Sequence, residues 1–289
     1  MSTNQTCLYS IPQKGRKVIW ELTNNCNMHC VHCCNAFERK RNRDIDLNKA
    51  LSLVDVLRDN AVSKVVLGGG EPLLFKGIFD LLSALSAAGM KVTLASNGYL
   101  IERYIEDLKK IEQLKVVLSL DGFSELTHDT FRGKKGAFRK VMTAIQLLTE
   151  NKIPIKLGVT IHRKNIQEIE DIVNFADKAK IKITFHSIIK TGAIDITGYA
   201  ISQKDYQNVI IAYANREHVN FRENPDKGYN VLDCPAGKKI FGIKPTGVFT
   251  PCHWISYQNA KFDSTNISDV LSFDIVASGI TRLPCRVFG

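Results

Sequence analysis

The stretch WELTNNCNMHCVHCCNAF, residues 20–37, joins the end of a strand-like run, Val18–Leu22, to a dense group of cysteines. Cys26, Cys30 and Cys33 have the spacing C-x3-C-x2-C, and a fourth cysteine follows directly. A short run rich in Val, Ile and Leu is typical of a buried parallel strand. The cysteines therefore follow the carboxyl end of the first strand, where ligands bind in open α/β sheets.

Similar short apolar runs recur downstream and alternate with amphipathic helical stretches. The further strand-like runs are Lys64–Leu67, Lys91–Ala95, Lys115–Leu120, Ile155–Ile161 and Ile181–Ile188. The helical stretches are Leu47–Asn60, Ile78–Ala88, Tyr99–Gln113, Ala137–Glu150 and Ile166–Lys178. Six such strands predict an α/β fold with a parallel sheet. Because six units are too few for a closed eight-stranded barrel, we expect an open sheet or a partial barrel.

The alternation ends after Ile188. Residues 190–230 contain one helical stretch, Gln203–Ala214, and the chain from Cys234 onward is rich in Gly and Pro, with short strands such as Val248–Thr250. A region with so few large apolar residues would be stabilised by a bound metal. The expected divisions are a barrel at 1–190, a bridging segment at 191–230 and a small C-terminal domain at 231–289.

The composition excludes several classes of protein. Eight cysteines among 289 residues are far fewer than the roughly 8–10% of a small disulfide scaffold. No apolar run approaches the ~18–20 residues that cross a membrane, and the N-terminus lacks the apolar region of an export signal. We therefore expect a cytoplasmic protein with reduced cysteines, which bind metals or act in catalysis more often than they form disulfides there.

Three closely spaced thiolates suit an iron–sulfur cluster. They can bind three irons of a four-iron cubane and leave the fourth iron open to a ligand. A structural zinc site is the alternative, but such a site pairs one C-x2–4-C with a second pair, and none lies near residues 26–33.

The cysteine spacing, with His32 directly before the third cysteine, resembles the signature of the radical S-adenosylmethionine (radical SAM) superfamily. Downstream segments agree in order and position. Residues 68–72 (GGGEP) and 96–98 (SNG) resemble the family's GGEP and TNG motifs. Residues 119–122 (SLDG) and 128–133 (HDTFRG) are similar to elements of the subfamily that carries SPASM or twitch extensions.

This resemblance implies a partial (β/α)6 TIM-like barrel, a 4Fe–4S cluster on Cys26, Cys30 and Cys33, and S-adenosylmethionine (SAM) bound to the cluster's open iron. Glycines allow backbone N–H groups to approach a ligand, glutamate can bind an ammonium group, and arginine can grip a carboxylate. By the likeness, Glu71 would hold the methionyl amino group, Ser119 the ribose and Arg132 the carboxylate. The SAM-binding residues that it implies are Gly69, Gly70, Glu71, Ser96, Asn97, Ser119 and Arg132.

A second group of cysteines lies near the C-terminus. Cys234 and Cys252 read C-x12-G-x4-C around Gly247, similar to the opening of a SPASM/twitch domain, whose cysteines hold auxiliary 4Fe–4S clusters. Cys285 is the expected third ligand, but Phe288 stands where a twitch domain has another cysteine. We therefore expect a truncated domain with one auxiliary cluster. The alternative is a set of unrelated buried thiols.

The resemblance also implies the reaction. A radical SAM enzyme cleaves SAM reductively to a 5′-deoxyadenosyl radical, which abstracts a substrate hydrogen. The SPASM/twitch likeness favours maturation of a ribosomally made peptide by crosslinking or epimerisation. Oxidation of a small molecule is the alternative, and a non-enzymatic iron–sulfur or zinc regulator is a remote one. Fewer than 30 residues precede the cysteines, so we expect no fused leader-binding domain at this end.

The expected partners follow from the same reading. They are a peptide or small-molecule substrate and a reductant such as flavodoxin or ferredoxin. Nucleic acid is not favoured, because the basic runs lack the interleaved aromatic residues of a base-stacking surface. No membrane partner is expected, and the sequence leaves the oligomeric state open.

Overall fold

One mixed sheet organises the chain. The computed structural model describes residues 15–36, 44–188, 195–221, 234–252, 263–274 and 278. Nine strands in these residues form a sheet in the order β7-β6-β5-β4-β3-β2-β1-β8-β9. The strands are β1 (Arg16–Thr23), β2 (Val62–Gly69), β3 (Lys91–Ser96), β4 (Leu114–Ser119), β5 (Ile155–Ile161), β6 (Lys182–Ser187), β7 (Val219–Phe221), β8 (Ile240–Ile243) and β9 (Phe249–Thr250).

The sheet curves without closing, as a partial barrel. Strands β1 to β7 pair in parallel, as does β1 with β8, and only the short β8–β9 pair is antiparallel. Along β1, residues 18, 20 and 22 are fully buried, whereas residues 17, 19 and 21 are half-buried. This alternation gives each strand one face under the helices and one inner face, since strand side chains have a period of two.

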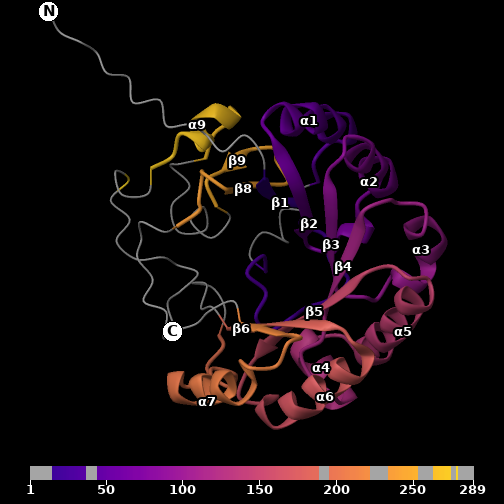
Figure 1. Cartoon of the computed structure of the whole chain (residues 1–289), viewed down its shortest axis with the longest axis vertical. Coiled ribbons are helices and arrows are strands. Elements are labelled where there is room, and N and C mark those ends of the chain that lie inside the picture. Colours follow the sequence, from indigo (N-terminus) through magenta and orange to yellow (C-terminus); the bar gives the residue numbers. More distant parts are fainter. Residues whose placement is uncertain are drawn as a thin grey trace, which may run out of the picture.

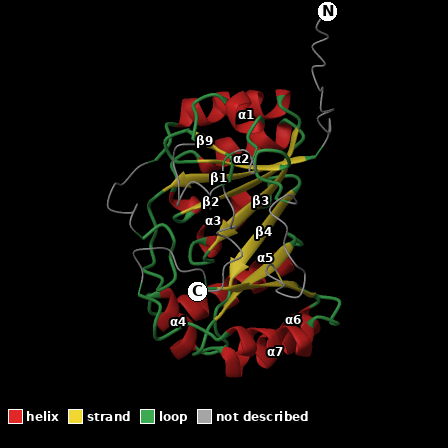
Figure 2. Cartoon of the chain, turned by 90° about the vertical axis from the view of Figure 1, so that its left-hand side faces the viewer, coloured by secondary structure: helices red, strands yellow, loops and turns green. Residues whose placement is uncertain are grey.

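Helices cover the outer side of the curved sheet, as Figure 1 shows for α1, α2, α3, α5 and α6. In Figure 2 the strands lie between α1 and α2 at the top and α4, α6 and α7 at the bottom. Their apolar residues pack with the outer faces of the strands into one core. The helices are α1 (Leu47–Asp59), α2 (Ile78–Ala87), α3 (Ile101–Leu108), α4 (Glu125–Arg132), α5 (Ala137–Glu150), α6 (Ile169–Ala179), α7 (Gln203–Tyr213) and α9 (Ile267–Leu271), with 3-10 turns η2 (Pro72–Leu74) and η3 (Ile166–Glu168).

The six expected strands and the partial barrel are confirmed. One helix is shorter than expected: α3 spans residues 101–108, whereas the sequence predicted a helix over 99–113. Helix α4 was not expected, although its sequence holds both end signals. Ser124 accepts a hydrogen bond from the backbone N–H of Thr127 at the start, and Gly133 ends the helix at a φ of 61°.

The C-terminal part of the chain joins the barrel sheet. Strand β8 pairs with β1 over four residues, from Lys17↔Ile240 to Trp20↔Ile243. The turn that follows, Lys244–Gly247, returns the chain as β9. A separate C-terminal domain at 231–289 stays a prediction.

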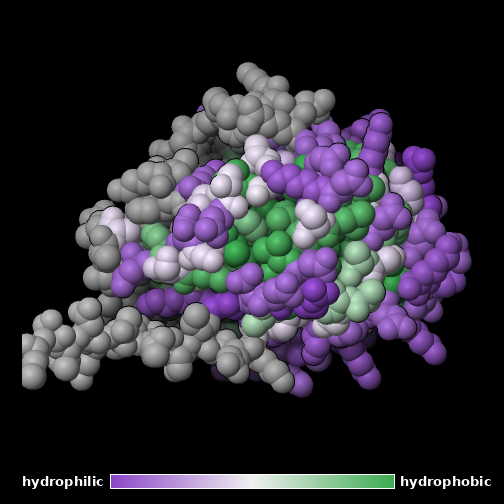
Figure 3. All heavy atoms as spheres, turned by 90° about the horizontal axis from the view of Figure 1, so that it is seen from above, coloured by the Kyte–Doolittle hydropathy of each residue, from purple (hydrophilic) through white to green (hydrophobic). Residues whose placement is uncertain are grey.

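One face of the molecule has a hydrophobic area with a hydrophilic border. Seen from above the view of Figure 1, hydrophilic side chains surround an area of hydrophobic ones (Figure 3). Large apolar side chains classed as exposed among the described residues are Leu74, Leu126 and Ile211. Within the described part of the chain, every helix is too short or too polar to cross a membrane.

Candidate active site

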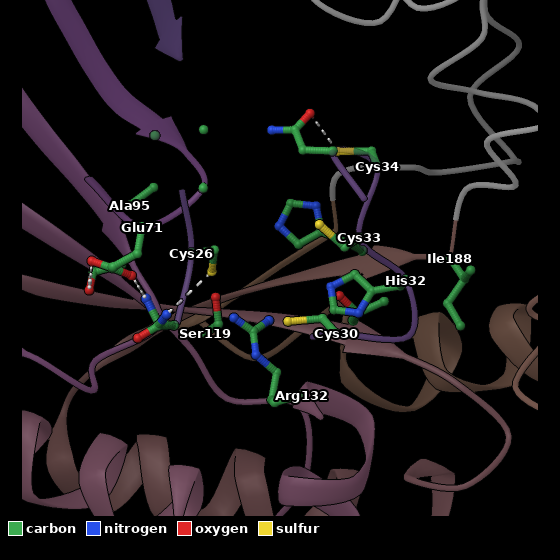
Figure 4. Close-up of a pocket in the computed structure, with 18 of the residues that line it drawn as sticks. Cys26, Cys30, His32, Cys33, Cys34, Glu71, Ala95, Ser119, Arg132 and Ile188 are labelled. Carbon is green, nitrogen blue, oxygen red and sulfur yellow. Dashed lines mark hydrogen bonds between the residues drawn. The ribbon is translucent and has the colours of Figure 1, made fainter. Parts of the chain in front are cut away.

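A cavity of about 300 Å³ opens at the carboxyl ends of the barrel strands. Every residue that the sequence analysis assigned to the SAM-binding site lines it (Figure 4). They are Cys26, Cys30, Cys33, Gly69, Gly70, Glu71, Ser96, Asn97, Ser119 and Arg132. Five motifs that lie far apart in the sequence thus meet in one place, because parallel strands bring their carboxyl ends to the same edge.

The three expected ligand cysteines lie on the loop of residues 24–36, here named the cysteine loop. In Figure 4 the sulfur atoms of Cys26, Cys30 and Cys33 face a common space. Cys34 points elsewhere, and its thiol lies 3.9 Å from the Asn35 side-chain oxygen. Among the described residues, no three His, Cys, Asp or Glu side chains are gathered closely enough to bind a single metal ion. A cubane holds each thiolate on a different iron, which suits a more open arrangement.

Helix α4 holds the cysteine loop in place. The backbone N–H of Val31 donates to the carbonyl of Phe131 at 2.9 Å, and the His32 ring stacks on Phe131 with centroids 4.4 Å apart. On its other side Phe131 stacks on His162 at 4.0 Å. At Gly133 a Cβ would lie 2.2 Å from the carbonyl oxygen of His29, so only glycine allows this approach.

The glycine-rich end of β2 packs against the same loop. Gly70 donates its N–H to the carbonyl of Thr23 at 2.7 Å, and Glu71 donates to the carbonyl of Asn25 at 2.7 Å. A Cβ at Gly70 would lie 1.9 Å from the Asn25 oxygen, so a side chain there would displace the cysteine loop. The glycine therefore sets the distance between the loop and the sheet.

The Glu71 side chain is fully buried and hydrogen-bonded. It accepts from the Ser96 hydroxyl at 2.8 Å, the Asn97 N–H at 2.9 Å and the Leu73 N–H at 3.3 Å. Burial raises the pKa of Glu71, and these three donors oppose that rise. A carboxylate fixed in this way can bind an ammonium group that enters the cavity.

Asn97 links the β3 end to the cysteines. Its side-chain amide donates to the Asn27 side-chain oxygen at 2.8 Å and lies 3.9 Å from the Cys26 sulfur. Its own oxygen accepts from the Tyr99 N–H at 3.0 Å. The amide orientation is therefore set by contacts on both sides.

Arg132 and Asp121 form a buried ion pair beside the cysteines. Their closest N···O distance is 3.0 Å, and the side chains are 9% and 1% exposed. Burial opposes the charge on both groups, yet the pKa of Arg132 is raised by Cys30 and Asp121, and the pKa of Asp121 is lowered mainly by Arg132. Burial also raises the pKa of Cys30, which Arg132 partly offsets.

One nitrogen of Arg132, Nε, is buried without a hydrogen-bond partner. Such an orphaned donor is costly, so a polar group that enters the cavity gains from binding there. Figure 4 shows the guanidinium ending beside the sulfur of Cys30. This position suits an anionic ligand next to the cysteines, and the contact with the SAM carboxylate that the resemblance implies for Arg132 stays a prediction.

Sequence reasoning assigned no role to three side chains that shape the site. Asp121 lies within the SLDG segment, but its pairing with Arg132 was not foreseen. Glu168 accepts from the Phe123 N–H at 2.5 Å and from the hydroxyls of Ser124 and Thr127 at 2.8 and 2.7 Å, which anchors the start of α4. No local signal marks Glu168. His186, near the end of β6, also lines the cavity.

A family model described as the radical SAM superfamily matches residues 20–176, which is more than half of the chain. The chain belongs to the radical SAM superfamily.

Curated proteins are similar to this chain over most of its length. The chain is 30% identical to an AdoMet-dependent heme synthase of Methanosarcina barkeri over 199 residues, or 68% of this chain and 56% of the relative. It is 26% identical to the sporulation killing factor maturation protein SkfB of Bacillus subtilis over 241 residues, 80% of this chain and 58% of SkfB. The chain thus spans little more than half the length of these relatives.

The radical SAM fold is also found among solved structures. Streptococcus suis SuiB bound to its precursor peptide SuiA matches with a TM-score of 0.74 at 19% identity, over 93% of this chain and 67% of SuiB. At this identity the likeness shows the fold, and it agrees with the open parallel sheet.

Of the C-terminal cysteines, Cys234 and Cys252 lie in the described part of this radical SAM protein, and both are outside the cavity lining. Cys234 and Cys252 are both half-buried. The N–H of Gly237 donates to the carbonyl of Pro251 at 2.9 Å, which brings the two cysteine-bearing segments side by side. Cys285 lies outside the described residues, so an auxiliary cluster on Cys234, Cys252 and Cys285 stays a prediction.

Proposed function

We propose that this protein is a radical SAM enzyme that matures a ribosomally made peptide, by crosslinking or epimerisation. The observation that carries the proposal is the convergence of three cysteines, a glycine-rich strand end and a buried arginine on one cavity. Family membership supports the SAM chemistry, and the likeness to SkfB and to SuiB, whose structure contains a precursor peptide, supports the peptide substrate.

The residues of the cavity fit the two cofactors that the family implies. Cys26, Cys30 and Cys33 would hold a 4Fe–4S cluster, and the space beside them would take SAM. When bound together, the reduced cluster and SAM supply a 5′-deoxyadenosyl radical that removes a hydrogen atom from a substrate. The protein's own part is to bind, to orient and to exclude water.

Different side chains around the cysteines would bind different groups of SAM. The fixed Glu71 carboxylate would bind the methionyl amino group, and the free Nε of Arg132 would donate to the carboxylate. Gly69 and Gly70 would leave backbone polar groups open to the same ligand, and Ser119 would bind the ribose. Ser96 and Asn97 act through Glu71, because both donate to its carboxylate.

Oxidation of a small molecule is the second candidate. It is favoured by the identity to the heme synthase, which at 30% exceeds the 26% shared with SkfB.

Two further components complete the proposal. Cys234, Cys252 and Cys285 would hold an auxiliary 4Fe–4S cluster, supported by the bond between Gly237 and Pro251 that joins their segments. A reductant such as flavodoxin or ferredoxin would supply the electron for SAM cleavage.

The test is anaerobic. The full chain, reconstituted with iron and sulfide, is mixed with SAM and dithionite, and 5′-deoxyadenosine is measured by chromatography. We expect formation of 5′-deoxyadenosine by the unaltered protein and none by a Cys26/Cys30/Cys33→Ala variant. Iron content should fall from about seven or eight to about four irons in that variant, since one cluster is lost.

Cys34→Ala is the matched control for iron content, because it removes a thiol from the same loop that points away from the other three. It should retain the iron of the unaltered protein. If the unaltered protein holds iron but makes no 5′-deoxyadenosine, the chain is a regulator rather than an enzyme. Modification of a porphyrin and not of a peptide by the active protein would favour the second candidate.

A further inference from the structure

A row of lysines crosses the amino ends of the barrel strands. Strands β1 to β6 each carry one lysine near the start: Lys17, Lys64, Lys91, Lys115, Lys156 and Lys182. Lys17 pairs in register with Lys64, Lys64 with Lys91, and Lys156 with Lys182. The set is here named the lysine row.

The lysine row lies on the inner face of the barrel. Five of its members stand four residues before a residue of the same strand that lines the cavity, and strand side chains repeat with a period of two. These cavity residues are Gly68, Ala95, Ser119, Thr160 and His186, which follow Lys64, Lys91, Lys115, Lys156 and Lys182 in turn. The row and the cavity thus share one concave face.

Electrostatics place four of these ammonium groups near one another. Burial lowers the pKa of Lys156, and the charges of Lys115, Lys17 and Lys182 lower it further. Lys17 on β1 and Lys156 on β5 are separated by three strands in the sheet. The charge of Lys17 nevertheless affects Lys156, so the curvature of the sheet must bring the two ends of the lysine row close to each other.

Negative charge is scarce around the row. Apart from Lys17, none of its lysines forms an ion pair with a carboxylate of the described residues. Glu21, four residues after Lys17 on the same face, is the nearby acidic residue of β1.

The residues on the inner face between the lysine row and the cavity are apolar or have small side chains. Ile19, Val66, Val117, Gly158 and Thr184 occupy this middle level, and all are half-buried rather than buried. Four residues of a strand span about 13 Å, so the lysine row lies about that far from the cavity. An extended peptide covers the same distance in about four residues.

We propose that the lysine row binds an acidic segment of the peptide substrate, about four residues from the residue that enters the cavity. The inference rests on the proposed peptide substrate and names its chemistry. Lys17, Lys64 and Lys91 stand opposite one another on strands about 4.8 Å apart, as do Lys156 and Lys182, whereas Lys115 is two residues out of register with Lys91 and with Lys156. Together these positive charges match the carboxylates of a glutamate- or aspartate-rich segment. A polynucleotide is less suited, because no Phe, Tyr or Trp stands on this face of the described strands.

The test measures binding of a fluorescein-labelled peptide of alternating glutamate and glycine to the anaerobically reconstituted full chain, by fluorescence anisotropy. The variant Lys115→Gln/Lys156→Gln/Lys182→Gln removes three charges from the row. Its matched control, Lys152→Gln/Lys178→Gln/Lys204→Gln, removes three lysines that lie outside the strands. Formation of 5′-deoxyadenosine from SAM without substrate is measured in both.

We expect binding about tenfold weaker in the row variant and unchanged in the control, since each ion pair contributes about a twofold affinity. A glutamine version of the peptide should not bind. Binding that fails, or that weakens equally in both variants, overturns the inference, as does tighter binding of a single-stranded oligonucleotide of equal charge. SAM cleavage that persists throughout separates such a failure from failure of the proposed enzyme activity.

Discussion

The buried pair of Asp121 and Arg132 yields the sharpest prediction on stability. Replacement of Asp121 by Asn keeps the size of the side chain and removes its charge. The carboxylate accepts from the Arg132 guanidinium at 3.0 Å and from the Thr160 N–H at 2.6 Å. In the variant, an amide group must face one of these two donors, and Arg132 loses its counter-charge.

The expected cost follows from burial. Because Asp121 is 1% and Arg132 9% exposed, water cannot replace the lost partner. Removal of one member of a buried pair costs about 3–5 kcal/mol, since an uncompensated charge stays behind. We therefore expect the free energy of unfolding to fall by about that amount in Asp121→Asn.

The same helix offers a control with the same distance and a different exposure. Arg139 and Glu125 also approach to 3.0 Å, but their side chains are 69% and 51% exposed. Glu125→Gln should lower stability by about 1 kcal/mol or less, because solvent screens the pair. Urea unfolding of the reduced, anaerobic protein, followed by circular dichroism at neutral pH, measures both variants.

The comparison can refute the reasoning. If Asp121→Asn costs no more than Glu125→Gln, the pair does not stabilise the fold, and burial is not what sets its contribution. A large loss in Asp121→Asn with a small loss in Glu125→Gln supports the reading.

Three further predictions concern the site's surroundings. Gly70→Ala should lower the free energy of unfolding by about 1–3 kcal/mol and reduce iron loading, because the new Cβ would collide with the cysteine loop. Gly68→Ala is the control and should be tolerated, because the nearest atom to its Cβ lies 3.8 Å away. Burial lowers the pKa of His128 to about 4, so the free energy of unfolding should fall by up to about 3 kcal/mol as the pH drops from about 6.5 to 4. Urea titrations at several pH values should show a smaller fall in His128→Gln. Glu168→Gln should cost about 1.5–3 kcal/mol by urea unfolding, since three donors at the start of α4 lose a charged acceptor.

Much of the site was predictable because it is built from short segments that follow strands. Cys26, Glu71, Asn97 and Ser119 each lie at the carboxyl end of a different strand. Once the strands are known to be parallel, these ends must meet at one edge, whatever the details of packing. The spacing of the cysteines then indicated the chemistry before any distance was known.

Other features depend on pairs of residues whose relation the sequence does not mark. Phe131 stacks between His32 and His162, and nothing in the spacing of these three residues indicates that contact. Helix α4 was missed since its eight residues are too few to show a clear apolar period. The pairing of β8 with β1 was missed for a similar reason, as four residues carry little pattern.

The sequence by itself therefore determined the family, the parallel sheet and the cysteine-centred site, because each is encoded in local runs and fixed spacings. The tertiary structure alone decided that Asp121 neutralises Arg132, that α4 supports the cysteine loop, and that six lysines share one concave face. These depend on strand register and on the curvature of the sheet, which are set by packing across the whole core rather than by any single segment.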